Sequence, residues 1–196
     1  MTCVVVGLGN PGEEYADTRH NAGRMVLEQF AKQYDFSEWE YEKKSDALVS
    51  KGKIGGHSVV LLLPETFMNA SGKSVGAYVK SAKAAQRLIV VYDELDIGFG
   101  SMKISFGRSS GGHRGVESIM KAVKSKDFVR LRIGISPRTA AGKVKKPKGE
   151  HKVLDFILKP FTPTEKKKLS GITKTASDAI AALIKEGRMN AMNQFN

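Results

Sequence analysis

The amino-acid sequence predicts an α/β protein with a mixed, twisted sheet flanked by helices. Two short apolar runs, 2–8 and 88–92, have the length and the β-branched content of buried strands, and segments with helical spacing of apolar residues follow them. The pair Gly55-Gly56 between two more strand-like runs indicates a hairpin, which adds antiparallel strands to the sheet. Because the chain has 196 residues and shows neither a repeat nor a linker, we expect residues 1–196 to form a single domain.

The N-terminal half alternates between strands and helices. Residues 9–17 follow the first strand and are expected to form a loop, because they are rich in glycine and polar residues. Apolar residues at helical spacing begin at Ala22, and Thr18 or Asn21 is in position to cap that helix. The polar stretch 38–44 shows no regular pattern. The other elements predicted here are strands at 47–54 and 58–63, a loop at 64–69 and a helix at 70–82.

The C-terminal half continues the same alternation. Asp93 stands at the end of the strand 88–92, and arginine alternates with apolar residues in a strand predicted over 129–135. A capping box at Thr162–Glu165, with proline at the first helical position, opens the last long helix, and Gly187 is suited to end it. Further predicted elements are a strand at 101–106, a Gly/Ser loop at 107–112, a helix at 115–124, a long loop at 136–150 and a short helix at 151–158.

The chain is strongly basic. It has 32 Lys and Arg residues against 20 acidic residues, a formal net charge of +12 at pH 7. The segment 138–168 holds ten Lys or Arg residues and three acids. The excess indicates a polyanionic partner, with loop-borne basic residues in contact with phosphates, and the alternative is a solvated basic surface. A second group of basic residues flanks the Gly/Ser loop and the strand after it, namely Lys103, Arg108, Arg114, Arg130 and Arg132.

Composition excludes several classes of protein. Cys3 is the one cysteine and lies in the first strand pattern as a small buried hydrophobe, which excludes a disulfide framework and a cysteine-rich zinc site. The N-terminus enters a strand directly, without the pattern of a signal peptide, and no apolar run approaches the roughly 18 to 20 residues that span a bilayer. We therefore expect a cytoplasmic protein without a membrane partner.

The glycines Gly7-x-Gly9-x-x-Gly12 match the dinucleotide-binding fingerprint, and they follow a strand. Asp35 lies near the place where such sites carry a ribose-binding acid. Three features weigh against this interpretation. Pro11 interrupts the turn that would present N–H groups to a pyrophosphate. Three acidic residues follow the third glycine, where the helix would have to begin, and repel phosphate. No clear second strand precedes the aspartate.

A histidine and an aspartate are the candidates for chemistry. His20 lies just before a predicted helix, where the positive end of the helix dipole favours a neutral imidazole that accepts a proton. Asp93 is suited to hold one ring N–H of that base. Asn10 and Asn69 lie in loops after strand-like runs, and their amides suit a peptide group or a developing oxyanion. The alternatives are a structural histidine, and cap or turn roles for the aspartate and the asparagines.

Neither a side-chain nucleophile nor a metal site is evident. The sequence contains no Gly-x-Ser-x-Gly and no His-Glu-x-x-His, and Cys3 lies inside a strand. Water is therefore the expected nucleophile, and we expect no metal and no other cofactor.

Four segments occur in order along the chain: Gly9-Asn10-Pro11-Gly12-x-x-Tyr15-x-x-Thr18-Arg19-His20-Asn21-x-Gly23, Thr66-Phe67-Met68-Asn69-x-Ser71-Gly72, Asp93-Glu94-Leu95-Asp96 and Gly111-Gly112-His113-x-Gly115. In their residues, order and spacing they resemble the signature segments of the bacterial-type peptidyl-tRNA hydrolase family. The resemblance covers essentially the whole chain. It implies a carboxylic ester hydrolase that cleaves the bond between a peptide and the 3′-terminal ribose of tRNA, and so recycles the tRNA.

The resemblance also implies roles for individual residues. By it, His20 is the base and Asp93 its partner. Lys103 and Arg132 match positions that contact a phosphate of the acceptor stem. The partner implied is peptidyl-tRNA, bound through its acceptor stem and 3′ end by a monomeric enzyme. The substrate-binding positions implied are Asn10, Tyr15, Phe67, Met68, Asn69, His113 and, next to it, Arg114.

The chain departs from the family at three positions. The family usually has asparagine where this chain has Arg114, often Lys or Arg where it has Glu117, and in some members a second basic residue where it has Ser105. An amide donates and accepts, whereas a guanidinium only donates, so the departure at position 114 affects substrate binding there, and the arginine can instead reach a phosphate. A non-catalytic RNA-binding protein on the same scaffold is the alternative class, and the otherwise intact candidate site argues against it.

Overall fold

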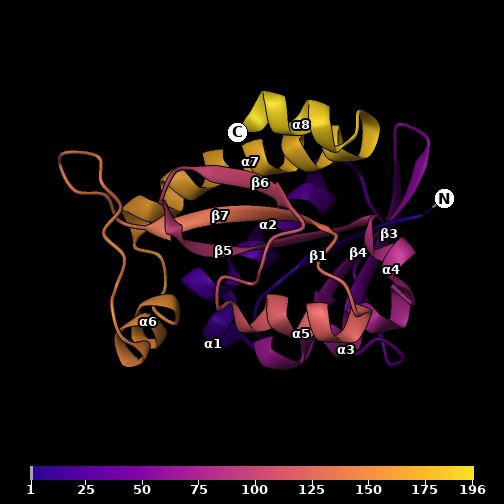
Figure 1. The fold of residues 1–196 in the computed structure, drawn as a ribbon, viewed down its shortest axis with the longest axis horizontal. Coiled ribbons are helices and arrows are strands. Elements are labelled where there is room, and N and C mark those ends of the chain that lie inside the picture. The colour runs from indigo at the N-terminus through magenta and orange to yellow at the C-terminus, as the bar shows by residue number, and fades with distance from the viewer. Residues whose placement is uncertain (1) are drawn as a thin grey trace.

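Figure 1 shows the computed structural model of the chain, which describes residues 2–196. Its strands are β1 (Cys3–Gly7), β2 (Glu40–Glu42), β3 (Ala47–Ile54), β4 (His57–Pro64), β5 (Leu88–Gly98), β6 (Met102–Phe106) and β7 (Val129–Ser136). Its helices are α1 (Glu13–Ala16), α2 (Ala22–Gln33), α3 (Ser71–Tyr78), α4 (Ala82–Ala85), α5 (Arg114–Val123), α6 (Glu150–Ile157), α7 (Pro163–Lys185) and α8 (Arg188–Phe195), with 3₁₀ turns at Arg19–Asn21 and Met68–Ala70. None of the helices within residues 2–196 combines the length and apolarity needed to cross a membrane.

The strands form one sheet in the order β2-β3-β4-β1-β5-β7-β6. β1 pairs in parallel with β4 and β5, and β5 pairs in parallel with β7. The other pairings are antiparallel, and one of them is the β3–β4 hairpin predicted at Gly55-Gly56. The predicted mixed α/β sheet is thus confirmed. Because the central strands are parallel, their carboxyl ends meet at one edge, which is the edge where α/β proteins bind ligands.

Helices cover both faces of the sheet (Figure 1). α2, α7 and α8 lie on one face, and α3 and α5 lie on the other. The strands supply both layers because successive side chains alternate between faces: Val5 packs in the first layer, and Val4 and Val6 pack in the second. A fully buried side chain of this kind contributes about 1.5–3 kcal/mol, so the two apolar layers hold the functional edge in place.

The structure lengthens or adds strands and helices that the sequence pattern underestimates. β5 continues past Tyr92 to Gly98, because its pairing with β7 extends through Asp93 and Glu94 and resumes at Gly98 after a register shift. A short strand, β2, lies within the polar stretch 38–44, because its backbone pairs with β3. α8 was not predicted, because half of its residues are polar and it is stabilised by its contacts with α7 and β6.

Helix boundaries also differ in places. The loop expected at 9–17 contains the one-turn helix α1, and the helix expected over 70–82 ends at Tyr78. Ser81 then begins α4 by accepting a hydrogen bond from the Ala84 N–H. Neither Thr18 nor Asn21 caps α2 with its side chain. The capping box before α7 is confirmed, with both reciprocal hydrogen bonds present.

Gly23 allows α2 to approach β1 and β5 closely. The Leu8 N–H donates to the Val91 carbonyl at 3.0 Å, and the Arg24 N–H donates to the Leu8 carbonyl at 3.2 Å, so the helix start and two strands meet at their backbones. A Cβ atom on residue 23 would lie 2.3 Å from the Val91 oxygen. Only glycine fits here, and this contact fixes the position of the preceding 3₁₀ turn.

Candidate active site

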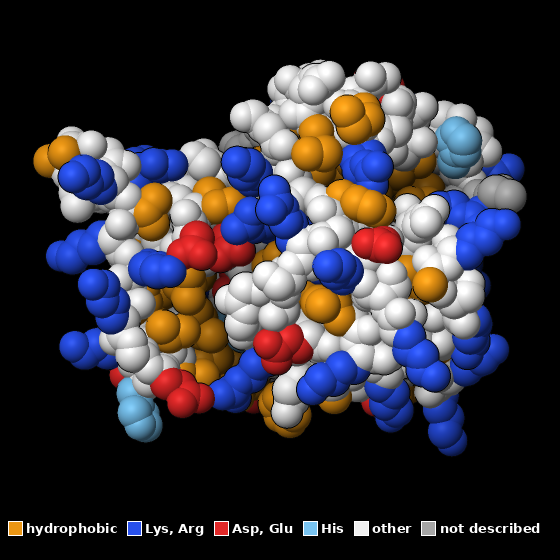
Figure 2. Space-filling model, in the orientation of Figure 1, with side chains coloured by type: hydrophobic (Ala, Val, Ile, Leu, Met, Phe, Trp, Pro, Cys, Tyr) orange, Lys and Arg blue, Asp and Glu red, His pale blue; other side chains and the backbone are white. Residues whose placement is uncertain are grey.

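A cleft of about 530 Å³ opens at the carboxyl edge of the parallel strands. In Figure 2 it is the hollow with apolar walls and acidic side chains at its border, below a group of basic side chains that lies over β6. The residues proposed from sequence for catalysis and substrate binding all line it, although they come from four separate segments. They are Asn10, Tyr15, His20, Phe67, Met68, Asn69, Asp93, His113 and Arg114.

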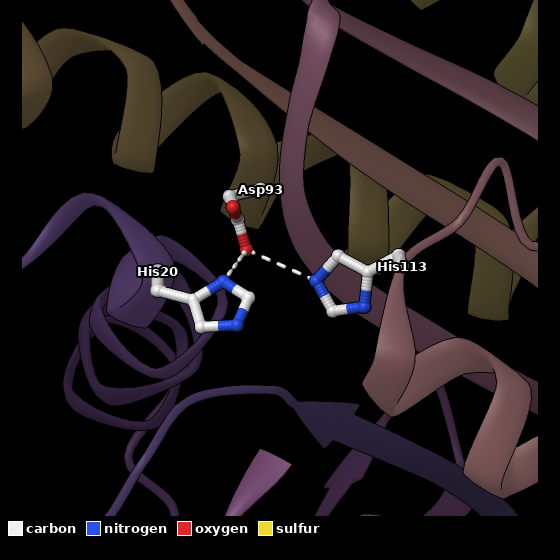
Figure 3. Close-up of side chains that lie close together, drawn as sticks. All are labelled: His20, Asp93 and His113. Carbon is white, nitrogen blue, oxygen red and sulfur yellow. Dashed lines mark hydrogen bonds and ion pairs between the residues drawn. The ribbon is translucent and has the colours of Figure 1, made fainter. Parts of the chain in front are cut away.

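At the base of the cleft, two histidines share one carboxylate oxygen (Figure 3). His20 Nδ1 lies 2.9 Å from Asp93 Oδ1, and His113 Nε2 lies 3.1 Å from the same atom. The Val116 N–H donates to His113 Nδ1 at 3.3 Å, so the proton of that ring is on Nε2, which donates to Asp93. His20 likewise donates through Nδ1, which leaves the lone pair of its Nε2 available to accept a proton.

Asp93 is almost completely buried. Burial by itself raises the pKa of this carboxyl, but the charge of His20 and the hydrogen bonds from His113 and His20 outweigh burial and hold the pKa well below its ordinary value. Asp93 therefore remains ionised at neutral pH, and an ionised carboxylate in this position can stabilise a positive charge on the His20 ring.

The three side chains also have the composition of a metal site, since their ligand atoms lie within 4.8 Å of one another. Their hydrogen bonding does not suit a metal. A neutral His113 that bound a metal through Nε2 would carry its proton on Nδ1, where it would face the Val116 N–H. The arrangement fits a shared set of hydrogen bonds better than a metal centre.

Asn21 holds Asn10 in place by pairing with its backbone. The Asn10 N–H donates to Asn21 Oδ1, and Asn21 Nδ2 donates to the Asn10 carbonyl, both at 2.9 Å. The Asn10 side-chain oxygen accepts from the Met68 N–H at 2.8 Å, so its amide NH₂ is the part left to face the cleft. The predicted amide is thus presented as a fixed donor. The sequence indicates only a cap role for Asn21, because its pairing with Asn10 depends on how the loop folds back.

Arg19 joins the turn that carries His20 to the start of α7. It donates to the carbonyls of Lys159 and Pro160, at 3.1 and 2.9 Å, and makes a two-pronged ion pair with Glu165. Its guanidinium also stacks on Phe156, 4.7 Å from the ring centroid. This side chain is buried, and it fixes His20 relative to α6.

One wall of the cleft was not predicted. It is the face of α6 formed by Val153, Leu154, Ile157 and Leu158. The signal available in the sequence was a short apolar pattern after a long polar loop. In the structure, no residue of α6 is fully buried. Two ion pairs join this wall to the opposite side: Arg114 with Glu150 at 2.8 Å, and Lys146 with Asp96.

The serine that lines the cleft and the single cysteine are not placed for attack. Ser110 lines the cleft, but its hydroxyl donates to Glu117 at 3.0 Å. Cys3 lies in β1 and donates to the Arg87 carbonyl, and burial raises the pKa of its thiol to about 11. This geometry agrees with water as the expected nucleophile.

Lys103 and Arg132 do not line the cleft. They are cross-strand neighbours on β6 and β7 and line an adjacent hollow of about 530 Å³. Arg132 pairs with Glu94 at 2.9 Å, and Glu94 lines both hollows. Arg130 differs from the other basic residues around the Gly/Ser loop because it is fully buried against Phe128, so it is not accessible to a phosphate.

The glycine segment does not form a phosphate-binding turn. Gly12 has a φ of 103° and precedes α1, whose first turn carries Glu13 and Glu14. A carboxylate oxygen of Glu14 lies 2.5 Å from the position that a Cβ on residue 12 would take, and a carboxylate this close to the turn repels a phosphate. The dinucleotide alternative is therefore not supported.

The fold and the site together define a hydrolase built on a mixed α/β sheet. A buried aspartate holds its histidine at the base of the cleft, and a basic surface lies beside the cleft. The sequence matches the family model described as peptidyl-tRNA hydrolase over residues 4–196. The chain belongs to the peptidyl-tRNA hydrolase family.

Individual relatives agree with this assignment. The peptidyl-tRNA hydrolase of Carboxydothermus hydrogenoformans is 42% identical over 194 residues, which cover 98% of this chain and 97% of the relative. That of Aquifex aeolicus is 40% identical over 98% of this chain and 95% of the relative. The crystal structure of peptidyl-tRNA hydrolase from Acinetobacter baumannii has a TM-score of 0.85 to this structure at 34% identity, and the match covers 100% of this chain and 94% of that one.

Proposed function

We propose that this hydrolase cleaves peptidyl-tRNA with a water molecule activated by His20. The observation that supports this most directly is the buried His20–Asp93 pair at the base of the cleft, with one ring nitrogen of the histidine uncommitted. In the proposed step, His20 Nε2 takes a proton from water as the water oxygen attacks the ester carbonyl. Asp93 holds the other ring nitrogen and stabilises the imidazolium.

The second half of the reaction returns the proton. The tetrahedral intermediate collapses, the bond between the carbonyl carbon and the ribose oxygen breaks, and His20 donates its proton to that oxygen. The products are a peptide with a free carboxylate and a tRNA with a free terminal hydroxyl. We assign the amide of Asn10 to the oxyanion, because the Met68 N–H fixes its orientation and leaves its NH₂ toward the cleft.

Binding is divided between the two hollows. The cleft, with its apolar α6 wall and with Tyr15, Phe67 and Asn69, is proposed to take the peptide and the 3′ end. Lys103 and Arg132 are proposed to meet an acceptor-stem phosphate beside it. We further propose that the chain works as a single domain and a monomer, and in the cytoplasm, because translation produces the substrate there.

Peptide release from a purified N-blocked aminoacyl-tRNA, measured with and without EDTA, tests this function. We expect release at the same rate in both samples, because the histidines and Asp93 bond to one another rather than to a metal. Loss of release on chelation, restored by added divalent metal, would contradict the mechanism. Binding of tRNA without release would instead support the RNA-binding alternative.

Arg114→Asn is expected to keep or raise kcat and to leave stability nearly unchanged. The Arg114–Glu150 pair is exposed, so its loss costs at most about 1 kcal/mol. An amide at this position can accept as well as donate, and it can therefore hold a peptide carbonyl or order water. The matched control is Glu150→Gln, which breaks the same pair and leaves residue 114 unchanged. A lower kcat in Arg114→Asn alone would show that the guanidinium participates directly.

A further inference from the structure

The hollow beside the cleft has a second basic side that comes from the C-terminal helix. β6, the Gly/Ser loop and α8 enclose it, and its lining includes Lys103, Arg108, Arg132 and Arg188. The two acidic residues that line it already form ion pairs, Glu94 with Arg132 and Asp96 with Lys146. Within residues 2–196, Lys103, Arg108 and Arg188 make no ion pair.

Arg188 is held in one orientation. Its guanidinium carbon lies 3.7 Å from the centroid of the Phe106 ring, and the residue is half-buried. Stacking on a ring uses the face of the guanidinium and leaves its N–H groups, which lie in its plane, free to donate. Because the side chain is ordered before any ligand binds, little conformational entropy is lost on binding.

The helix that carries Arg188 is fixed along the edge of the sheet. Asn196 at its end pairs with the backbone of β6, with the Ile104 N–H donating to Asn196 Oδ1 at 2.7 Å and Asn196 Nδ2 donating to the Ile104 carbonyl at 3.1 Å. Ala191, a residue of the same helix, is fully buried against the core. The distance between Arg188 and β6 is therefore set by the fold.

We propose that Arg188, supported by Phe106, binds a backbone phosphate of the RNA substrate. This inference rests on the proposed contact of Lys103 and Arg132 with the acceptor stem, and it adds a second phosphate to that contact. Lys103 and Phe106 are three residues apart on β6, about 10 Å along the strand, and their side chains leave opposite faces of this edge strand, although Lys103 and Arg188 line the same hollow. The two sites are therefore expected to meet different phosphates. Arg188 is a binding residue, and Phe106 is its positioning residue.

The test is the salt dependence of tRNA binding together with kcat and KM for peptidyl-tRNA. Arg188→Gln is expected to reduce the slope of log K against log salt by about one unit, to raise KM, and to leave kcat unchanged. Phe106→Leu is expected to weaken binding in the same direction, while Phe106→Tyr, which keeps the ring, retains the slope. The control Lys53→Gln removes an exposed charge from β3, which lies toward the opposite edge of the sheet, and should leave both constants unchanged.

Lys103→Ala separates this inference from the proposed function. A reduced slope in Lys103→Ala with an unchanged slope in Arg188→Gln would overturn the role of Arg188 and leave the acceptor-stem contact standing. Unchanged slopes in both variants would overturn both assignments. If Arg188→Gln does not fold, the comparison of Phe106→Leu with Phe106→Tyr decides, and equal slopes in those two variants would reject the proposal.

Discussion

His20→Ala is expected to lower kcat for peptidyl-tRNA by about 10²–10⁴-fold while tRNA binding stays close to that of the unaltered protein. The reason is that the proposed base lies in the cleft, whereas the basic residues proposed to bind the tRNA phosphates line the adjacent hollow. Single-turnover peptide release, measured alongside equilibrium binding of uncharged tRNA, separates the two effects.

Two further variants make this result specific. His57→Ala removes an exposed histidine at the start of β4 and should leave kcat unchanged. Asp93→Asn should lower kcat substantially, because a neutral amide no longer stabilises the imidazolium and disturbs the hydrogen bonds of both histidines. Full activity in His20→Ala would remove this residue from the mechanism.

Gly23→Ala is expected to destabilise the protein by about 1–3 kcal/mol or more, which in a chain of this size lowers Tm by about 2–4 °C per kcal/mol. The added Cβ would lie 2.3 Å from the Val91 oxygen and 2.8 Å from the Leu8 nitrogen. Val91 lies in β5 and Leu8 directly follows β1, so these backbone atoms cannot move aside at low cost in free energy. The measurement is thermal or urea unfolding.

Gly76→Ala is the matched control, since it makes the same substitution inside α3. Its nearest neighbour would be the Ala122 Cβ at 3.8 Å, which is an ordinary contact. Alanine favours a helix over glycine by up to about 1 kcal/mol, so this variant should be unchanged or more stable. Equal destabilisation of the two variants would show that helix propensity rather than the close approach of α2 dominates.

The features that could be predicted from the sequence were those that depend on neighbouring residues along the chain. The apolar runs identified β1 and the first half of β5, and the position of His20 before a helix made it a candidate base. The continuation of β5 beyond Tyr92 could not be predicted, because it depends on pairing with β7 rather than on its own composition. The sequence pattern underestimates any element that is stabilised from outside itself.

The candidate site shows the same limit. His20 and Asp93 could be paired by residue type, but the sharing of one oxygen with His113 depends on where α5 begins. The α6 wall was missed because an amphipathic face normally indicates contact with a core, and this one faces a cleft.

The contacts of Arg19 with Lys159, Pro160 and Glu165 bear on the order of events during synthesis. The residue is made near the beginning of translation, and the carbonyls it binds are about 140 positions later. Contacts of such long sequence separation form late in folding, because a large loop must be closed before they are gained. A nascent chain that already contains His20 and Asp93 therefore still lacks the contacts of Arg19 and the α6 wall. We expect it to become competent for hydrolysis only when the last third of the polypeptide has left the ribosome.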